Sequence, residues 1–265
     1  MNRADVLWIY SMPTWLFSVL AIGSMALIAM IGHWAVRRVM PVRDIVKNND
    51  VAGFILGIIG TAYAVLISFV VVGVWQQYET SDSVTSSEAA AVSDLHHLSD
   101  ALPSPAGPLL KSELDRYADV MIKEEWPAMQ HGGWSPEAQR LSRVMLLQIA
   151  TFTPRTASQQ AIQAKMLDRG DALLDARRQR LHDNETGIPG ILWWTLFAFA
   201  AITIGFTFLF GLESVKIQLL MTAALSTAIA LIFVLIAELD YPYRGDTGIT
   251  PHSWYQIQHQ LHSDR

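Results

Sequence analysis

The chain has 265 residues, of which 51% are hydrophobic and 16% are charged, and its formal net charge is −5 at neutral pH. Average proteins carry about 25% charged residues, so this composition is unusually apolar. The modest negative charge argues against nucleic acid as a partner, because a phosphate backbone requires a basic surface. The absence of cysteine excludes disulfides, thiolate catalysis, and iron–sulfur or cysteine–zinc sites.

From the N-terminus, the apolar residues gather into blocks without Asp, Glu, Lys or Arg at 15–36, 51–75, 191–210 and 217–237. A helix needs about 20 apolar residues to cross the hydrocarbon core, where a charge costs at least about 2.5 kcal/mol. Aromatic residues such as Trp15, Trp75 and Trp193 mark block ends, as is typical of membrane interfaces. The sequence therefore predicts an all-α integral membrane protein with four transmembrane helices, arranged as hairpins over 1–76 and 189–240.

The segment between the second and third blocks, 77–188, is predicted to form a soluble four-helix bundle. Apolar residues at three- and four-residue spacing predict that span two continues as one helix to about Leu102. A second helix is predicted to end at Trp126–Pro127, and Ser135 is expected to cap a third. The pair Thr153–Pro154 repeats the pattern at Ser135 and predicts the start of a fourth helix. Four amphipathic helices bury their apolar stripes by packing into an antiparallel bundle.

Positive residues in short loops favour the cytoplasmic side of a membrane. The loop between spans three and four contains Lys216, and the loop between spans one and two contains Arg37, Arg38, Arg43 and Lys47. This pattern predicts an inner (plasma) membrane protein whose bundle and termini lie outside the cytoplasm, although three arginines shortly before span three oppose that orientation. The last segment, 241–265, is predicted to be a polar C-terminal tail.

Span two carries small residues at Gly53, Gly57 and Gly60, which allow helices to approach closely in lipid. They indicate a tight oligomer or a pore-lining helix, and ordinary packing within one chain is the alternative. The residues that follow on one face, at spacings of four and three, are Val65, Phe69 and Val72. Around a symmetry axis this face would form an apolar constriction that gates by dewetting. In a monomer it would face lipid.

Two pairs of adjacent polar residues in the predicted bundle, His96–His97 and Glu124–Glu125, are candidates for a metal site. Adjacent residues on a helix point about 100° apart, so metal ligands require a spacing of three or four, or a second helix. The favoured interpretation is a solvated face. The sequence therefore predicts no metal site and no cofactor.

Further charged residues lie near the ends of the spans. Glu238 and Asp240 could form a cation-attracting vestibule, but capping of backbone amides is the favoured interpretation. His33 is expected at the membrane interface. Three arginines lie shortly before span three, at Arg177, Arg178 and Arg180. They could bind an anion or lipid headgroups, but pairing with acidic residues of the bundle is the favoured interpretation.

Several short segments together resemble the bacterial membrane proteins of a bestrophin-like domain family of unknown function, over about 49–245. The residues that carry the resemblance are Trp75, Tyr78, Glu79, Glu88, Trp126, Pro127, Arg177, Arg178, Arg180, Asp240 and Pro242. More distantly, the segment Trp75–Glu79 is similar to one in bestrophins, which are pentameric anion channels with an apolar neck on the second span. The resemblance implies a pore lined by span two and a cytoplasmic bundle. The neck aromatics of bestrophins are not matched here, since Thr61 and Val65 stand in the corresponding places.

These observations predict a homo-oligomeric channel-like protein, a tetramer or pentamer in the lipid bilayer, that conducts an inorganic ion, with an anion implied by the resemblance. Val65, Phe69 and Val72 would form the constriction. The alternative is a membrane-anchored sensor or scaffold whose bundle binds a partner or ligand. The sequence contains no phosphate-binding glycine loop, nucleophile elbow or zinc-protease motif, so an enzyme is not predicted.

Overall fold

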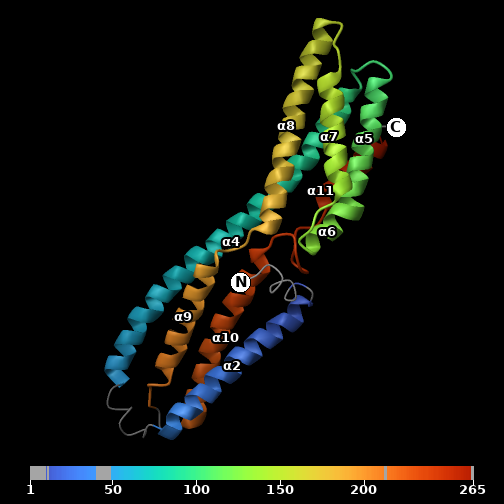
Figure 1. Cartoon of the computed structure of the whole chain (residues 1–265). Helices are drawn as coiled ribbons and strands as arrows, with labels where there is room; N and C mark the ends of the chain where they lie inside the picture. Colours follow the sequence, from blue (N-terminus) through green and yellow to red (C-terminus); the bar gives the residue numbers. More distant parts are fainter. Residues whose placement is uncertain (1–9, 11, 40–48, 212–213, 264–265) are drawn as a thin grey trace. The chain divides into compact units, whose positions relative to one another are not determined.

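The computed structural model describes residue 10 and residues 12–39, 49–211 and 214–263, and these are helical over most of their length (Figure 1). The helices in chain order are α2 (Thr14–Val39), α4 (Asn49–Ser99), α5 (Ala106–Val120), the π-helical turn η2 (Met121–Glu125), α6 (Trp126–Gln130), α7 (Pro136–Thr151), α8 (Ala157–Glu185), α9 (Gly190–Thr207), α10 (Val215–Asp240) and α11 (His252–Ser263). The chain divides into two compact units. Unit 1 contains Met1–Gln76, Ile188–Asp240 and Gly245–Thr247, and unit 2 contains Gln77–Gly187, Tyr241–Arg244 and Gly248–Arg265.

Unit 1 is built from α2, the first half of α4, α9 and α10. Within the described residues, four helices are long and apolar enough to cross a membrane. Three predicted spans coincide with α2, α9 and α10 to within about three residues, and the predicted span 51–75 lies within the longer α4. The chain is therefore a membrane protein, and the hydropathy pattern located its spans because length and charge alone decide whether a helix fits the bilayer.

Side chains from three helices hold unit 1 together. The Tyr63 ring of α4 stacks on Phe199 of α9 at a centroid distance of 5.8 Å, and its hydroxyl donates to the Leu196 carbonyl at 3.2 Å. The rings of Phe197 on α9 and Phe233 on α10 meet edge to face at 4.9 Å. Aromatic pairs of this kind contribute about 0.5–1.5 kcal/mol each beyond their buried area.

Helix α4 is a single helix of 51 residues, which confirms that span two continues without interruption beyond the membrane segment. Its first half belongs to unit 1 and its second half to unit 2. At 1.5 Å per residue the helix is about 75 Å long, more than twice the thickness of the hydrocarbon core. The predicted end near Leu102 differs by three residues from the observed end at Ser99.

Unit 2 contains the second half of α4 together with α5, η2, α6, α7, α8 and α11, around one apolar core. The prediction of a polar tail over 241–265 is wrong for its described part. Trp254 of α11 is fully buried, and Tyr243, Ile249 and Leu261 also belong to the core. The mean polarity of the tail concealed an amphipathic helix, which adds a further helix to the predicted four.

Of the helix ends predicted in unit 2, one is confirmed and two are wrong. Ser135 caps α7 as predicted, and its side chain accepts a hydrogen bond from the Ala138 amide. The predicted cap at Thr153 is wrong, because Thr156 caps α8 and accepts from the Gln159 amide. The second helical run also continues past Pro127 to Gln130. The π-turn before it bonds the Trp126 amide to the Met121 carbonyl, and this wider turn accommodates the proline ring and its missing N–H.

Candidate functional site: one face of α4

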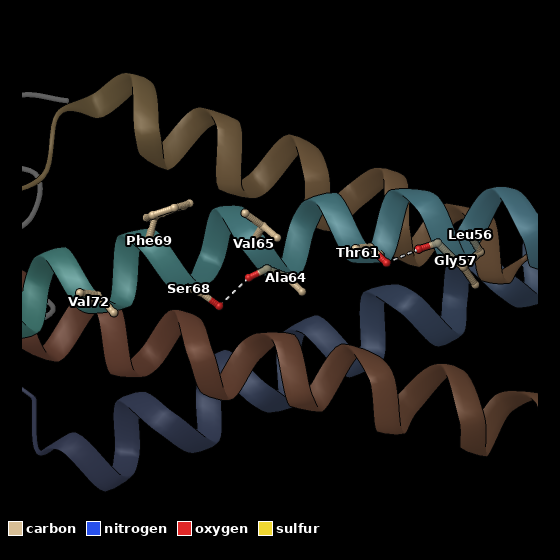
Figure 2. Close-up of a pocket in the computed structure, with 9 residues that line it drawn as sticks. Leu56, Gly57, Thr61, Ala64, Val65, Ser68, Phe69 and Val72 are labelled. Atoms are coloured by element: carbon tan, nitrogen blue, oxygen red, sulfur yellow. Dashed lines mark hydrogen bonds between the residues drawn. The ribbon is translucent and has the colours of Figure 1, made fainter.

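One face of the membrane part of α4 is covered and the opposite face is open. The covered side carries Tyr63, Ile67, Val70 and Val74, which are buried at spacings of four, three and four. The open side forms a shallow groove, here called the α4 groove, lined by Leu56, Gly57, Gly60, Thr61, Ala64, Val65, Ser68, Phe69 and Val72 (Figure 2). None of these nine residues is ionisable. The groove is therefore an apolar face with two hydroxyl groups.

The predicted constriction residues all lie in this groove and are exposed within the single chain: Val65 is 51% exposed, Phe69 75% and Val72 52%. Gly57 and Gly60 also line it, and a Cβ added to either would meet no atom within 4 Å. Gly53 differs, since a Cβ there would lie 3.8 Å from Phe210. Gly53 thus packs within the chain, whereas Gly57 and Gly60 leave an open surface.

A second cluster lies in the core of unit 2 and is here called the buried ion network: Glu88, Tyr117, Glu125, Arg177 and Arg180. Arg180 donates from Nε to Glu88 at 2.6 Å and from Nη2 to Glu125 at 3.1 Å, and Arg177 donates from Nη1 to the same Glu125 oxygen at 2.8 Å. The Tyr117 hydroxyl donates to Glu88 at 2.7 Å. Two positive and two negative side chains balance, so the network carries no net charge into the core.

The secondary structure explains why these side chains meet. Arg177 and Arg180 are three residues apart and share one face of α8, whereas the intervening Arg178 points outwards and pairs with exposed Asp175. The π-turn η2 brings both Glu125 and Trp126 into the interior although they are adjacent in sequence. Such turns are often found at functional sites.

Glu125 and His96 were expected on a solvated face, and the structure corrects this for both. Glu125 is fully buried, where it also accepts a hydrogen bond from the Ser135 amide at 2.6 Å. His96 is buried with its Nε2 3.6 Å from Asp115, and burial, followed by nearby Lys111, lowers its pKa below 6.5. A count of acidic and basic residues cannot show which of them face inwards. Arg177 and Arg180 pair with acidic residues of unit 2, as favoured over binding of an anion or lipid headgroups.

Burial and neighbouring charges fix the protonation states of Tyr117 and Arg180. Burial raises the pKa of Tyr117 far above its usual value, and neighbouring Glu88 adds to this effect. Burial alone would lower the pKa of Arg180, but Glu88 and Glu125 outweigh it and raise the pKa well above the ordinary value. Tyr117 therefore stays a neutral donor and Arg180 a cation at any physiological pH. The network is suited to a structural role, because neither the Tyr117 hydroxyl nor the Arg180 guanidinium exchanges a proton near neutrality.

A family model described as Bestrophin-like domain matches residues 23–254, which include the α4 groove and the buried ion network. The chain belongs to the Bestrophin-like family. The match confirms the family resemblance that the short motifs indicated, and it extends the matched region towards the N-terminus.

The Bestrophin-like chain is also similar in fold to solved structures of a bacterial bestrophin homologue from Klebsiella pneumoniae. One of these has a TM-score of 0.63 at 14% identity and covers 93% of this chain and 98% of that chain. Two others have TM-scores of 0.63 at 15% and 14% identity, and each covers 94% of this chain and 97% of that chain. No match was found among curated proteins. At this level of identity the similarity concerns the fold.

The motif residues of this Bestrophin-like chain are distributed between several places. Glu88, Arg177 and Arg180 meet in the buried ion network, and the Arg180 guanidinium lies 5.6 Å from the centre of the Trp126 ring. Pro127 follows in α6, and Tyr78 packs partly buried against the core of unit 2. Pro242 is buried, and Asp240 is the last residue of α10. The other three motif residues have exposed side chains: Trp75, Glu79 and Arg178.

Asp240 accepts hydrogen bonds from the Ile188 amide at 2.5 Å and from the Trp193 indole at 3.3 Å. This agrees with backbone capping, the favoured interpretation of the acidic end of span four. Glu238 accepts from the hydroxyls of Thr14 at 3.0 Å and Thr247 at 2.9 Å. Among the described residues, no group of three or more His, Asp or Glu side chains could hold a metal ion.

The His33 side chain is fully buried in unit 1, and its expected position near the membrane interface stays a prediction. Its ring meets Phe208 edge to face at 5.8 Å, and neither ring nitrogen has a hydrogen-bond partner among the described residues. One turn later, Arg37 bonds Gln218 of α10. Close packing of α2 against α10 encloses this face of α2, which hydropathy alone does not predict. Arg43 and Lys47 of the same loop lie outside the described residues.

Proposed function

We propose that this Bestrophin-like protein is a homo-oligomeric channel of the inner membrane in which α4 lines the axis. The observation that carries the proposal is the α4 groove, an uncharged and uncovered face on a helix whose other side is packed. The occupant of the groove is further copies of the same chain. One helix per subunit encloses an aqueous path only when about four or five copies surround an axis, so a tetramer or pentamer is expected.

Two further observations support this assembly. Gly57 and Gly60 lie in the groove without a close neighbour, although glycine within a helix costs about 0.5–1 kcal/mol relative to alanine. Approach of a second copy would use the close contact that glycine permits. The resemblance to bestrophins, which are pentameric channels with an apolar neck, supports the same arrangement. In the assembly Val65, Phe69 and Val72 constrict the axis.

The first test is the subunit number of the detergent-purified protein by native mass spectrometry. A tetramer or pentamer is expected. A monomer or dimer would remove the axial pore and would favour the second candidate, a sensor or scaffold. That candidate rests on α4, because one continuous helix connects a membrane span with the core of unit 2 and could transmit strain.

The second test measures ion leak from vesicles that contain the protein, once native mass spectrometry has established a tetramer or pentamer. Replacing Phe69 by Ala removes the largest exposed side chain of the groove, so the constriction widens and wets, and leak is expected to rise. Leu220→Ala is the matched control, since Leu220 is 70% exposed on α10 and does not line the groove. Equal leak from the wild type and Phe69→Ala would contradict a constriction at this position.

We also propose that unit 2 lies outside the cytoplasm, because the described basic residues Arg37 and Arg38 lie in the last turn of α2 and Lys216 lies in the first turn of α10. The cysteine-free chain allows a direct test. Ser158 is exposed near the start of α8, whereas Ser135 is a buried cap and unsuitable for labelling. Ser158→Cys should react with an impermeant maleimide in intact cells. Protection until the cells are lysed would establish the opposite orientation.

A further inference from the structure

The α4 groove contains two hydroxyl side chains, Thr61 and Ser68, both exposed (Figure 2). At 100° per residue, they lie with Val65 and Val72 within an arc of about 60° on the helix surface. Phe69 lies about 40° outside this arc, on the side of Val65. The hydroxyl groups therefore stand at the centre of the groove, about 10 Å apart along the helix, with Val65 between them.

The hydrogen bonds of these hydroxyl groups fix which way their protons point. Thr61 Oγ1 donates to the Gly57 carbonyl at 2.8 Å, and Ser68 Oγ donates to the Ala64 carbonyl at 2.8 Å (Figure 2). A carbonyl oxygen has no proton, so the hydroxyl must be the donor in both contacts. A hydroxyl has one proton and two lone pairs. With the proton engaged by the helix, each oxygen can only accept from whatever occupies the groove.

The rest of the lining offers no donor to an anion. The other seven side chains are aliphatic, aromatic or glycine, and the backbone N–H groups are used within the helix. An anion would have to rotate each hydroxyl away from its carbonyl, whereas a cation meets the lone pairs directly. Divalent cations are held by carboxylates, which the groove lacks, so neutral oxygens suit a monovalent cation.

We propose that Thr61 and Ser68 form two rings of acceptor oxygens that favour monovalent cations, such as K⁺ or Na⁺, over chloride. This assignment rests on the proposed function, because the rings exist only if copies of α4 surround an axis. It is opposite to the anion that the resemblance to bestrophins implies.

The test measures the reversal potential of the reconstituted ring under a KCl gradient. It uses the wild type and Phe69→Ala, so that a narrow constriction does not conceal the preference. In whichever of these two proteins conducts, the reversal potential should lie closer to the equilibrium potential of K⁺ than to that of Cl⁻. The double variant Thr61→Val/Ser68→Ala should lower the ratio of K⁺ to Cl⁻ permeability by about three- to tenfold, the range expected for one hydrogen-bond-strength contact.

Two controls separate selectivity from packing. Thr195 on α9 is half-buried and makes the same bond, to the Ile191 carbonyl at 2.8 Å, but lies outside the groove. Thr195→Val should leave the permeability ratio unchanged. Thr61→Ser and Ser68→Thr keep the hydroxyl groups and should keep the cation preference.

The outcomes distinguish this inference from the proposed function. A conducting ring that prefers Cl⁻, or whose K⁺ preference survives the double variant, would overturn the role of Thr61 and Ser68 and leave the pore intact. A protein that forms no ring, or a ring that conducts neither ion even as Phe69→Ala, would overturn the proposed function, and the inference would fail with it.

Discussion

Replacing Arg180 by Met tests whether the buried ion network stabilises unit 2. Methionine keeps most of the volume of the arginine stem and removes its charge. Arg180 and Glu88 are both fully buried, and Arg180 makes contacts at 2.6 and 3.2 Å with Glu88 and at 3.1 Å with Glu125. After the change Glu88 retains the Tyr117 hydroxyl, and the core carries one uncompensated negative charge.

The expected cost follows from that charge. Removing one partner of a buried ion pair destabilises a protein by about 3–5 kcal/mol, much more than an exposed pair contributes. For a domain of this size about 3–5 °C of melting temperature corresponds to 1 kcal/mol, so the midpoint should fall by about 10–20 °C. Circular dichroism of the detergent-purified protein measures this midpoint.

Two further variants make the result specific. Arg178→Met is the control, because Arg178 lies two residues away and pairs with Asp175 at the exposed surface; it should shift the midpoint little. The double variant Glu88→Gln/Arg180→Met restores a neutral core and should recover part of the loss. A shift of Arg180→Met no larger than that of Arg178→Met would refute the reasoning. So would a double variant that loses the full sum of the two single changes.

Two other predictions concern unit 2. Burial lowers the pKa of His96 below 6.5, so on acidification the His96 ring gains a proton in the unfolded chain before it does in the folded protein. The stability of the folded protein should therefore fall as the pH drops through about 6.5. The melting temperature of His96→Gln should depend less on pH between 7 and about 5 than that of the wild type. An equal pH dependence in both proteins would contradict this. Trp254→Ala should destabilise the protein by about 3–5 kcal/mol, because the side chain is fully buried, whereas Tyr255→Ala at an exposed position should change the melting temperature little. Similar melting temperatures for the two variants would show that α11 does not contribute to the core.

The sequence located the elements that local physics decides. The uncharged blocks identified α2, α4, α9 and α10, because the bilayer imposes a fixed apolar length on each helix. The continuity of α4 and the cap at Ser135 also followed from nearby residues, since propensity and capping act over a few positions. The motifs of the Bestrophin-like family were recognisable for the same reason: they are short and contiguous.

Long-range packing decided the inward-facing polar groups. Glu125 meets Arg177 across more than 50 positions, and a count of charges could not assign that pair. The one available signal was the three-residue spacing of Arg177 and Arg180, which places both on one face. Trp254 is similar, because its polar neighbours concealed a helix that only the core of unit 2 could order.

The sequence by itself determined that this is a four-span helical membrane protein of the Bestrophin-like family, because hydropathy, helix periodicity and short motifs are local properties of the chain. Only the tertiary structure decided which face of α4 is open and which acidic and basic residues pair in the core. Those properties depend on contacts between residues distant in sequence, and their free energies arise only when burial removes water from both partners.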